Sequence, residues 1–340
     1  MSITARAAYN KPCFYQGVQV WILCFSLRQI PAGAFILYDG FPERRGVFLS
    51  IIKGGPGTGK SGFMRRISAA AKQSGLDTEE IICSGDPDSL DALYIPALGR
   101  AWMDGTAPHV REPRVFAADA GYEDLGRFCA SPLGRTDAAL AREINRDYKA
   151  VYAQAYRLLA AAAKTADCTH EVPLSCAGAE KISELIGEAS EPGFIKRRFL
   201  RALSCKGRVR LAGTLRELCS RIVMLSDEGL EQTARLAEES GLSAIVCPQP
   251  LRPDKLDAVL LPGSSLAFVS RAWGRESTES IEDEAENEYA PLLDELLDAA
   301  CTQLDKAKGM HDELERVYRP YMDFAALTEY TDGVISSLFD

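Results

Sequence analysis

A glycine-rich loop, KGGPGTGKS at residues 53–61, constrains the fold of this chain more than any other stretch. In this loop four residues separate Gly54 from the sequence Gly59-Lys60-Ser61. It follows the β-rich run 47–52 and precedes a segment whose apolar residues recur with helical spacing. Strand, loop and helix in this order are the context in which such a loop binds phosphate groups.

The residue types in the loop match the needs of a nucleoside triphosphate. Glycines allow positive φ angles, so successive backbone N–H groups can form a concave anion site at the positive end of a helix. Lys60 is placed to reach the β- and γ-phosphate oxygens, and the Ser61 hydroxyl to ligate Mg²⁺. The sequence therefore predicts ATP and Mg²⁺ as ligands. The predicted nucleotide-binding residues are Gly54, Gly55, Pro56, Gly57, Thr58, Gly59, Lys60 and Ser61.

Asp104 is the candidate for the second acidic group of such a site, because it ends the short apolar run 101–103. We expect Asp104 and Ser61 to hold Mg²⁺, and Lys60 and Asp104 to be catalytic. The alternative for Asp104 is an ordinary turn with Gly105. His109, in the loop that follows, is either a phosphate contact or incidental.

Two other groups of charged residues leave alternatives open. Asp86, Asp88 and Asp91 follow a predicted strand and either orient a nucleophile or serve as turn and helix-cap residues. The basic residues act as phosphate sensors, as a nucleic-acid patch or as a solvated surface. They are Arg65, Arg66, Lys196, Arg197, Arg198 and Arg201.

The amino-acid composition restricts the classes of ligand and partner that the chain is expected to bind. The net charge of −9 provides no general attraction to nucleic acid. The 10 cysteines contain no Cys-x-x-Cys pair and there are only 3 histidines, so neither a zinc site nor a disulfide framework is indicated. The apolar run 18–25 is too short to span a bilayer. We expect a cytoplasmic protein with reduced thiols, no membrane contact, and a protein or small-molecule partner that the sequence does not identify.

The chain also contains an internal repeat. The segment from Ser74 to Pro96 is echoed from Ser240 to Pro262, with Cys83 matching Cys247 and Asp91 matching Asp257. At the position of the loop the second copy has Ser226-Asp227-Glu228, whose carboxylates would repel phosphate. Two copies of one α/β unit, the second without its nucleotide, explain this pattern.

We therefore predict an α/β fold with a parallel sheet of the P-loop NTPase type in two tandem copies, the second degenerate. Amphipathic helical regions begin near residue 136 and at residue 291, so each copy should carry a helical appendage. The predicted domains are residues 20–190, with the P-loop, and residues 191–340, the degenerate copy with the C-terminal helices.

The loop, the Cys-x-x-Asp-Pro-Asp-x-Leu-Asp stretch at 83–91, the segment 104–109 and the two-copy layout together resemble an uncharacterised bacterial family. This family of tandem P-loop proteins occurs mostly in anaerobic Firmicutes. The resemblance extends over most of the chain from about residue 20. It implies ATP binding, and the members of the family are described only as ATPases or nucleotide-binding proteins.

The leading hypothesis is a Mg²⁺-dependent ATP-binding protein that hydrolyses ATP at one intact P-loop site. One alternative is a small-molecule or nucleotide kinase whose acidic loop, residues 86–91, holds the acceptor. Another is a non-enzymatic adaptor gated by the nucleotide. The sequence does not distinguish ATP from GTP, nor does it determine the oligomeric state.

Overall fold

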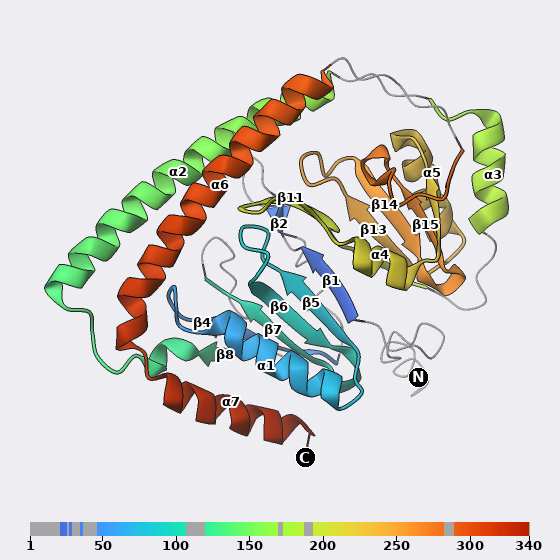
Figure 1. Cartoon of the computed structure of the whole chain (residues 1–340). Coiled ribbons are helices and arrows are strands. Elements are labelled where there is room, and N and C mark those ends of the chain that lie inside the picture. Colours follow the sequence, from blue (N-terminus) through green and yellow to red (C-terminus); the bar gives the residue numbers. More distant parts are fainter. Residues whose placement is uncertain are drawn as a thin grey trace.

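The computed structural model describes residues 21–25, 27–28, 35–36, 46–106, 120–168, 173–186, 193–281 and 289–339. These residues form an α/β protein with two six-stranded mixed sheets. A pair of long helices lies side by side along one flank of the molecule and extends past both sheets (Figure 1). Among the described residues, no helix is long and apolar enough to cross a membrane.

The first sheet has the strand order β1-β5-β6-β7-β4-β8. Its strands are β1 (Trp21–Phe25), β4 (Phe48–Lys53), β5 (Thr78–Ile82), β6 (Leu90–Ile95), β7 (Arg100–Asp104) and β8 (Ala120–Asp124). β6 runs antiparallel to both of its neighbours, whereas the other pairs are parallel. The prediction of a parallel sheet is therefore wrong for β6. Only residues 83–89 join β5 to β6, which suffices for an antiparallel return but not for a crossover.

Alternation along β4 buries both faces of the first sheet. Ile52 packs in one apolar cluster with Met64 and Ile67 of helix α1 (Lys60–Gln73), and all three are fully buried. Leu49 and Ile51 belong to a second cluster on the other face. Helix α7 (Phe324–Phe339) then covers α1, so the C-terminal segment of the chain belongs to the core of the first sheet.

The second sheet has the order β9-β13-β14-β15-β12-β16, read from its β9 edge. Its strands are β9 (Ile195–Arg197), β12 (Arg221–Met224), β13 (Ala244–Pro248), β14 (Leu256–Leu261), β15 (Leu266–Val269) and β16 (Glu279–Ser280). Here β14 is the antiparallel strand. Strand order and strand directions thus agree position by position with those of the first sheet.

Shorter elements complete both halves. A hairpin of β2 (Leu27–Arg28) and β3 (Phe35–Ile36) follows β1, and one of β10 (Arg201–Ser204) and β11 (Gly207–Arg210) follows β9. Helix α4 (Ala212–Leu218) precedes β12, and helix α5 (Asp227–Glu239) follows it and packs on helix α3 (Cys176–Ile186).

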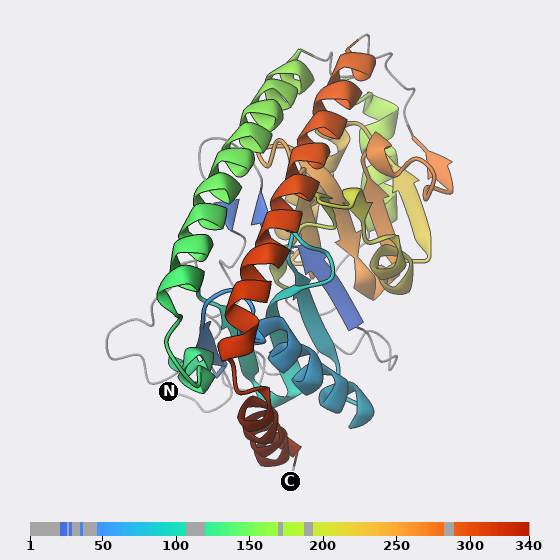
Figure 2. The same cartoon turned by 60° about the vertical axis from the view of Figure 1, so that its left-hand side comes forward.

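The two long helices are α2 (Arg135–Asp167) and α6 (Ala290–Tyr318). Both views show them side by side over most of their length (Figure 2). Small buried residues such as Ala155 and Ala162 of α2 and Ala300 of α6 let the two helices approach closely. The predicted helical appendages therefore pack against each other, although residues 168–289 separate them in the sequence.

A buried ion cluster joins β5 of the first sheet to the β9 edge of the second sheet. Glu79 of β5 accepts hydrogen bonds from Lys196 of β9 and from Arg198, and the three side chains are at most 4% exposed. Burial raises the pKa of Glu79, but the two cations and their hydrogen bonds outweigh burial and lower this pKa to about 2. Glu79 is thus a carboxylate at neutral pH and links the halves.

Candidate nucleotide-binding site

The glycine-rich loop spans residues 54–59, between the end of β4 at Lys53 and the start of α1 at Lys60. Gly57 and Gly59 have φ angles of 72° and 86°, in the left-handed region. Gly59 is the N-cap of α1 and offers no capping side chain, so the first N–H groups of the helix point into the loop. Such an arrangement, with the positive end of a helix behind it, can bind an anion.

Lys60 reaches back across this loop. Its ammonium donates hydrogen bonds to the carbonyl oxygens of Gly54 and Gly55, at 2.9 and 3.0 Å. The same Nζ atom lies 3.7 Å from Oδ2 of Asp104, and both side chains remain partly exposed. The sheet explains this approach, because β7 lies beside β4 and Asp104 pairs in register with Ile52.

Ser61 and Asp104 are the residues that could hold Mg²⁺. The hydroxyl of Ser61 accepts a hydrogen bond from the backbone N–H of Leu90 at 2.9 Å. One carboxylate oxygen of Asp104 accepts from both the N–H and the hydroxyl of Thr106, which fixes its orientation. A hydroxyl and an oriented carboxylate beside an anion site are the oxygen donors that Mg²⁺ prefers.

One cavity of about 950 Å³ brings the predicted site residues together. Every predicted loop residue and Asp104 line it. These lining residues are Gly54, Gly55, Pro56, Gly57, Thr58, Gly59, Lys60, Ser61 and Asp104. His109 lies outside the described residues.

The C-terminal helices close the cavity over the loop. A Cβ atom on Gly57 would lie 3.2 Å from the carbonyl oxygen of Glu315 in α6. A Cβ atom on Gly59 would lie 2.8 Å from Cδ2 of Leu327 in α7. Both glycines therefore also serve close packing against a segment that is more than 250 residues away in the sequence.

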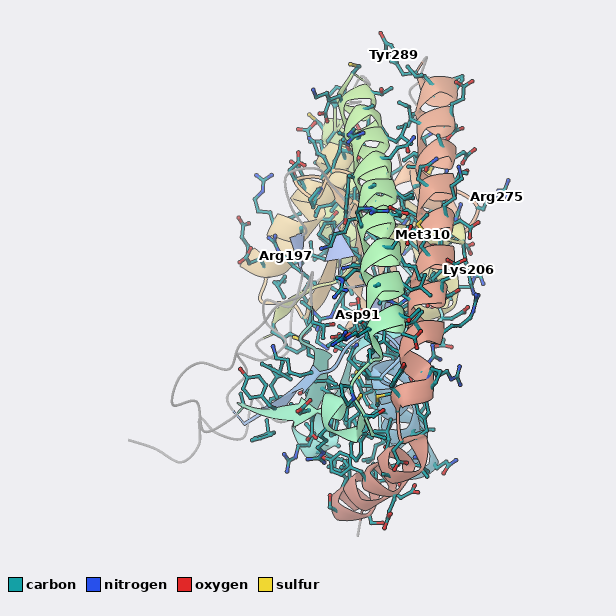
Figure 3. All side chains as sticks on the ribbon, turned by 90° about the vertical axis from the view of Figure 1, so that its left-hand side faces the viewer. Asp91, Arg197, Lys206, Arg275, Tyr289 and Met310 are labelled. Carbon is teal, nitrogen blue, oxygen red and sulfur yellow. The ribbon has the colours of Figure 1, made fainter. Side chains whose placement is uncertain are left out.

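The acidic loop, residues 83–91 including the first two residues of β6, forms another wall, and its three aspartates differ. Asp86 lines the cavity, accepts a hydrogen bond from the hydroxyl of Ser89 and lies 3.5 Å from the ammonium of Lys308. Asp91 also lines the cavity and is buried, at the level where α2 and α6 meet the first sheet (Figure 3). Asp88 is exposed and pairs with Lys206, whose hydrogen bond lowers the pKa of Asp88.

An aromatic wall faces this loop. Tyr148, Tyr152 and Tyr156 recur every four residues along α2, and neighbouring ring centroids are 4.9 and 5.7 Å apart. The ring of His311 on α6 lies 6.0 Å from that of Tyr148. Burial raises the pKa of all three tyrosines, so their hydroxyls stay neutral and can donate hydrogen bonds.

The thiol of Cys83 also lines the cavity. Burial, followed by the negative charge of Asp91, raises its pKa well above the ordinary value. Cys83 is therefore a neutral thiol and not an activated nucleophile.

The sequence did not predict that residues of α2 and α6 form walls of the cavity. The tyrosines were expected on the apolar face of a helix, and Lys308, His311, Glu315 and Arg319 were not singled out. His311, Asp312 and Glu315 place ligand atoms within 4.8 Å of one another, a grouping that could also hold a metal ion. The one signal for the tyrosines was their recurrence every four residues, which places them on one face of α2.

Most of the basic residues considered earlier have partners within the fold. Arg66 pairs with Asp332 of α7, and Arg65 donates to the carbonyl oxygen of Asp88. Lys196 and Arg198 are buried against Glu79. Arg201 forms two hydrogen bonds with the fully buried Asp257. These side chains do not form an exposed basic patch.

The equivalent position in the second half has no such loop. Only residues 225 and 226 separate β12 from α5, compared with residues 54–59 in the first half. Ser226 caps α5 by accepting the N–H of Gly229, and the first helical turn carries Asp227 and Glu228. The N-terminus of α5 is therefore already occupied by its own side-chain oxygen.

Asp257, the counterpart of Asp91, shows what this carboxylate does in the second half. Besides Arg201, it accepts hydrogen bonds from the hydroxyl of Ser270 and the indole N–H of Trp273. All three partners of Asp257 are side chains of the protein itself. Asp257 is therefore a structural residue that satisfies buried donors.

Comparison with known proteins found no match: no protein-family description, no curated protein and no solved structure is similar to this chain.

Proposed function

We propose that this protein binds Mg²⁺–ATP at the loop 54–61 and hydrolyses it slowly. The observation that carries the proposal is the convergence of three groups. A backbone anion site, the ammonium of Lys60 and the carboxylate of Asp104 all face one cavity. These groups match the charge distribution of a triphosphate with its metal ion.

In this proposal the residues act mainly through electrostatics. The loop N–H groups hold the β-phosphate, and Lys60 exchanges its bonds with the carbonyl groups of Gly54 and Gly55 for phosphate oxygens. Ser61 and Asp104 hold Mg²⁺, which neutralises charge that develops on the phosphate oxygens. α6 and α7 exclude water from the loop, so each charge interaction is strengthened.

We further propose that both halves are P-loop-type units derived from one repeat. The identical strand orders, the antiparallel strand at the same position and the hairpin after each edge strand support this. The short connection to α5 and the acidic first turn of this helix argue that the second unit has lost its nucleotide. Its role is then structural or regulatory, through the helix pair α2–α6.

The test is the variant Lys60→Ala, with Lys72→Ala as the matched control. Lys72 lies near the end of the same helix and pairs with Glu80 outside the cavity. We expect calorimetry to show ATP binding to the wild type and to Lys72→Ala, and none to Lys60→Ala. Phosphate release from ATP should likewise occur in the wild type and in Lys72→Ala, and be absent in Lys60→Ala. An unchanged ATP affinity in Lys60→Ala refutes the site.

A further inference from the structure

We propose that the tyrosine-lined end of the cavity binds a second substrate, a nucleoside monophosphate or similar flat-ringed phosphomonoester, which accepts the γ-phosphoryl group of ATP. This inference rests on the proposed nucleotide site and goes beyond it. It identifies what occupies the part of the cavity that the loop and Asp104 do not use.

The sheet order gives the direction in which the cavity extends. The triphosphate lies over the end of β4, and its γ end is at the Mg²⁺ group Asp104, at the end of β7. The loop 83–91 follows β5, further along the sheet on the same side. Since Leu90 of this loop also contacts Ser61, its cavity wall begins directly beside the metal position. A ligand between this loop and α2 therefore lies beyond the γ-phosphate.

The aromatic wall has the chemistry of a ring-binding surface. The apolar contact between α2 and α6 includes Leu159, Ala162 and Ala300, and Tyr156 packs against it, whereas Tyr148 and Tyr152 are not part of this cluster. The tyrosines line the cavity together with Leu304 and His311 of α6. Tyr152 is pressed against the backbone of the acidic loop, since a Cβ atom on Gly85 would lie 2.8 Å from its hydroxyl oxygen. Aromatic faces of this kind stack on nucleobases.

Cations near this wall specify an anionic group on the same ligand. Lys149, next to Tyr148 on α2, lines the cavity, is exposed and has no carboxylate partner in the described part of the chain. Lys308 reaches in from α6, between Asp86 and Asp312. The ammonium of Lys149 can pair with a phosphate group, whereas Lys308 already pairs with Asp86 and Asp312.

The reaction balances without a further reactant. The bond between the γ-phosphorus and the β–γ bridging oxygen breaks, and this oxygen leaves with ADP. A bond forms between the γ-phosphorus and a phosphate oxygen of the acceptor, which becomes a diphosphate. A dianionic phosphate carries no proton on the attacking oxygen, so a general base is not needed.

The experiment titrates AMP, CMP, GMP and UMP, with glycerol 3-phosphate as the probe that lacks a ring, into the Mg²⁺–ADP-loaded protein. We expect at least one nucleoside monophosphate to bind below about 1 mM and glycerol 3-phosphate to bind more weakly. Tyr152→Leu should weaken the binding of this monophosphate about tenfold and leave ATP affinity within twofold. Tyr152→Phe, which keeps the ring, should retain the wild-type affinity for the monophosphate. Lys149→Gln tests whether the ammonium charge of Lys149 contributes to the binding of the monophosphate. The position is exposed, so the substitution does not disturb folding.

Three results would overturn the inference. The first is that none of the four nucleoside monophosphates binds. The second is an equal loss of ATP and monophosphate affinity in Tyr152→Leu, which assigns the wall to the base of ATP itself. The third is unchanged monophosphate affinity in both Tyr152→Leu and Lys149→Gln. A protein that binds ATP but no monophosphate contradicts only this inference, whereas a wild type that binds no ATP contradicts the proposed function.

Discussion

The ammonium of Lys60 lies 3.7 Å from the carboxylate of Asp104, although one residue begins helix α1 and the other ends strand β7. In the proposed function, this pair brings a cation for phosphate oxygens beside an oxygen ligand for Mg²⁺. It exists because β4 and β7 are parallel neighbours, which brings the ends of both strands to one edge of the sheet.

Asp104→Asn should separate binding from turnover. The amide keeps an oxygen for Thr106 but removes the charge that we propose holds Mg²⁺. We expect Mg²⁺-dependent phosphate release to fall about 10–100-fold and metal-free ATP affinity to stay within about threefold. Asp124→Asn is the control, since Asp124 ends the other strand beside β4 but lies outside the cavity lining. Full activity of Asp104→Asn would show that Asp104 is not a functional residue of the site.

Gly59→Ala should weaken both the fold and the site. Its φ of 86° disfavours a side chain, and the added Cβ would meet Leu327 at 2.8 Å. We expect a loss of about 1–2 kcal/mol in the free energy of unfolding, measured with urea, and weaker ATP binding. Gly333→Ala in the exposed part of α7 meets no atom within 4 Å and should stabilise by about 0.5–1 kcal/mol. Equal effects of the two substitutions would contradict the packing of α7 on the loop.

Glu79 should make stability depend on acid pH. Its folded-state pKa of about 2 lies below the ordinary value of 4.5, so its contribution is fully present above about pH 4.5 and is lost as pH falls toward 2. The difference corresponds to about 3 kcal/mol. Urea titrations between pH 6 and 2 should show this loss. Glu79→Gln should already be destabilised at pH 7, because two cations stay buried without their partner. A variant as stable as the wild type at pH 7 would show that the cluster does not link the halves.

The loop, the strand before it and the helix after it could be predicted from the sequence. The reason is that Gly54 to Ser61 form a contiguous pattern with a local physical cause. Asp104 was singled out because it ends an apolar strand after this loop, and the structure places it beside Lys60. The antiparallel strand β6 was missed because alternating strands and helices favour a parallel sheet, and the short connection 83–89 was not weighed.

The pairing of α2 with α6 could not be predicted in the same way. Periodicity identifies the buried face of each helix, but not which surface covers that face. Tyr148 and His311 therefore looked like unrelated helical residues, although their rings lie 6.0 Å apart. The wall of the site opposite the loop depends entirely on this long-range contact.

The most direct test of the account is the number of nucleotides bound per chain. The first half has the loop and Lys60, whereas in the second half Ser226, Asp227 and Glu228 occupy the equivalent position. Carboxylates in place of a cation and a backbone nest cost several kcal/mol, and about 1.4 kcal/mol is a tenfold loss in affinity. Calorimetric titration of the wild type with Mg²⁺–ATP should give one site per chain, absent in Lys60→Ala. Two sites per chain, or tight binding that persists in Lys60→Ala, would contradict the account.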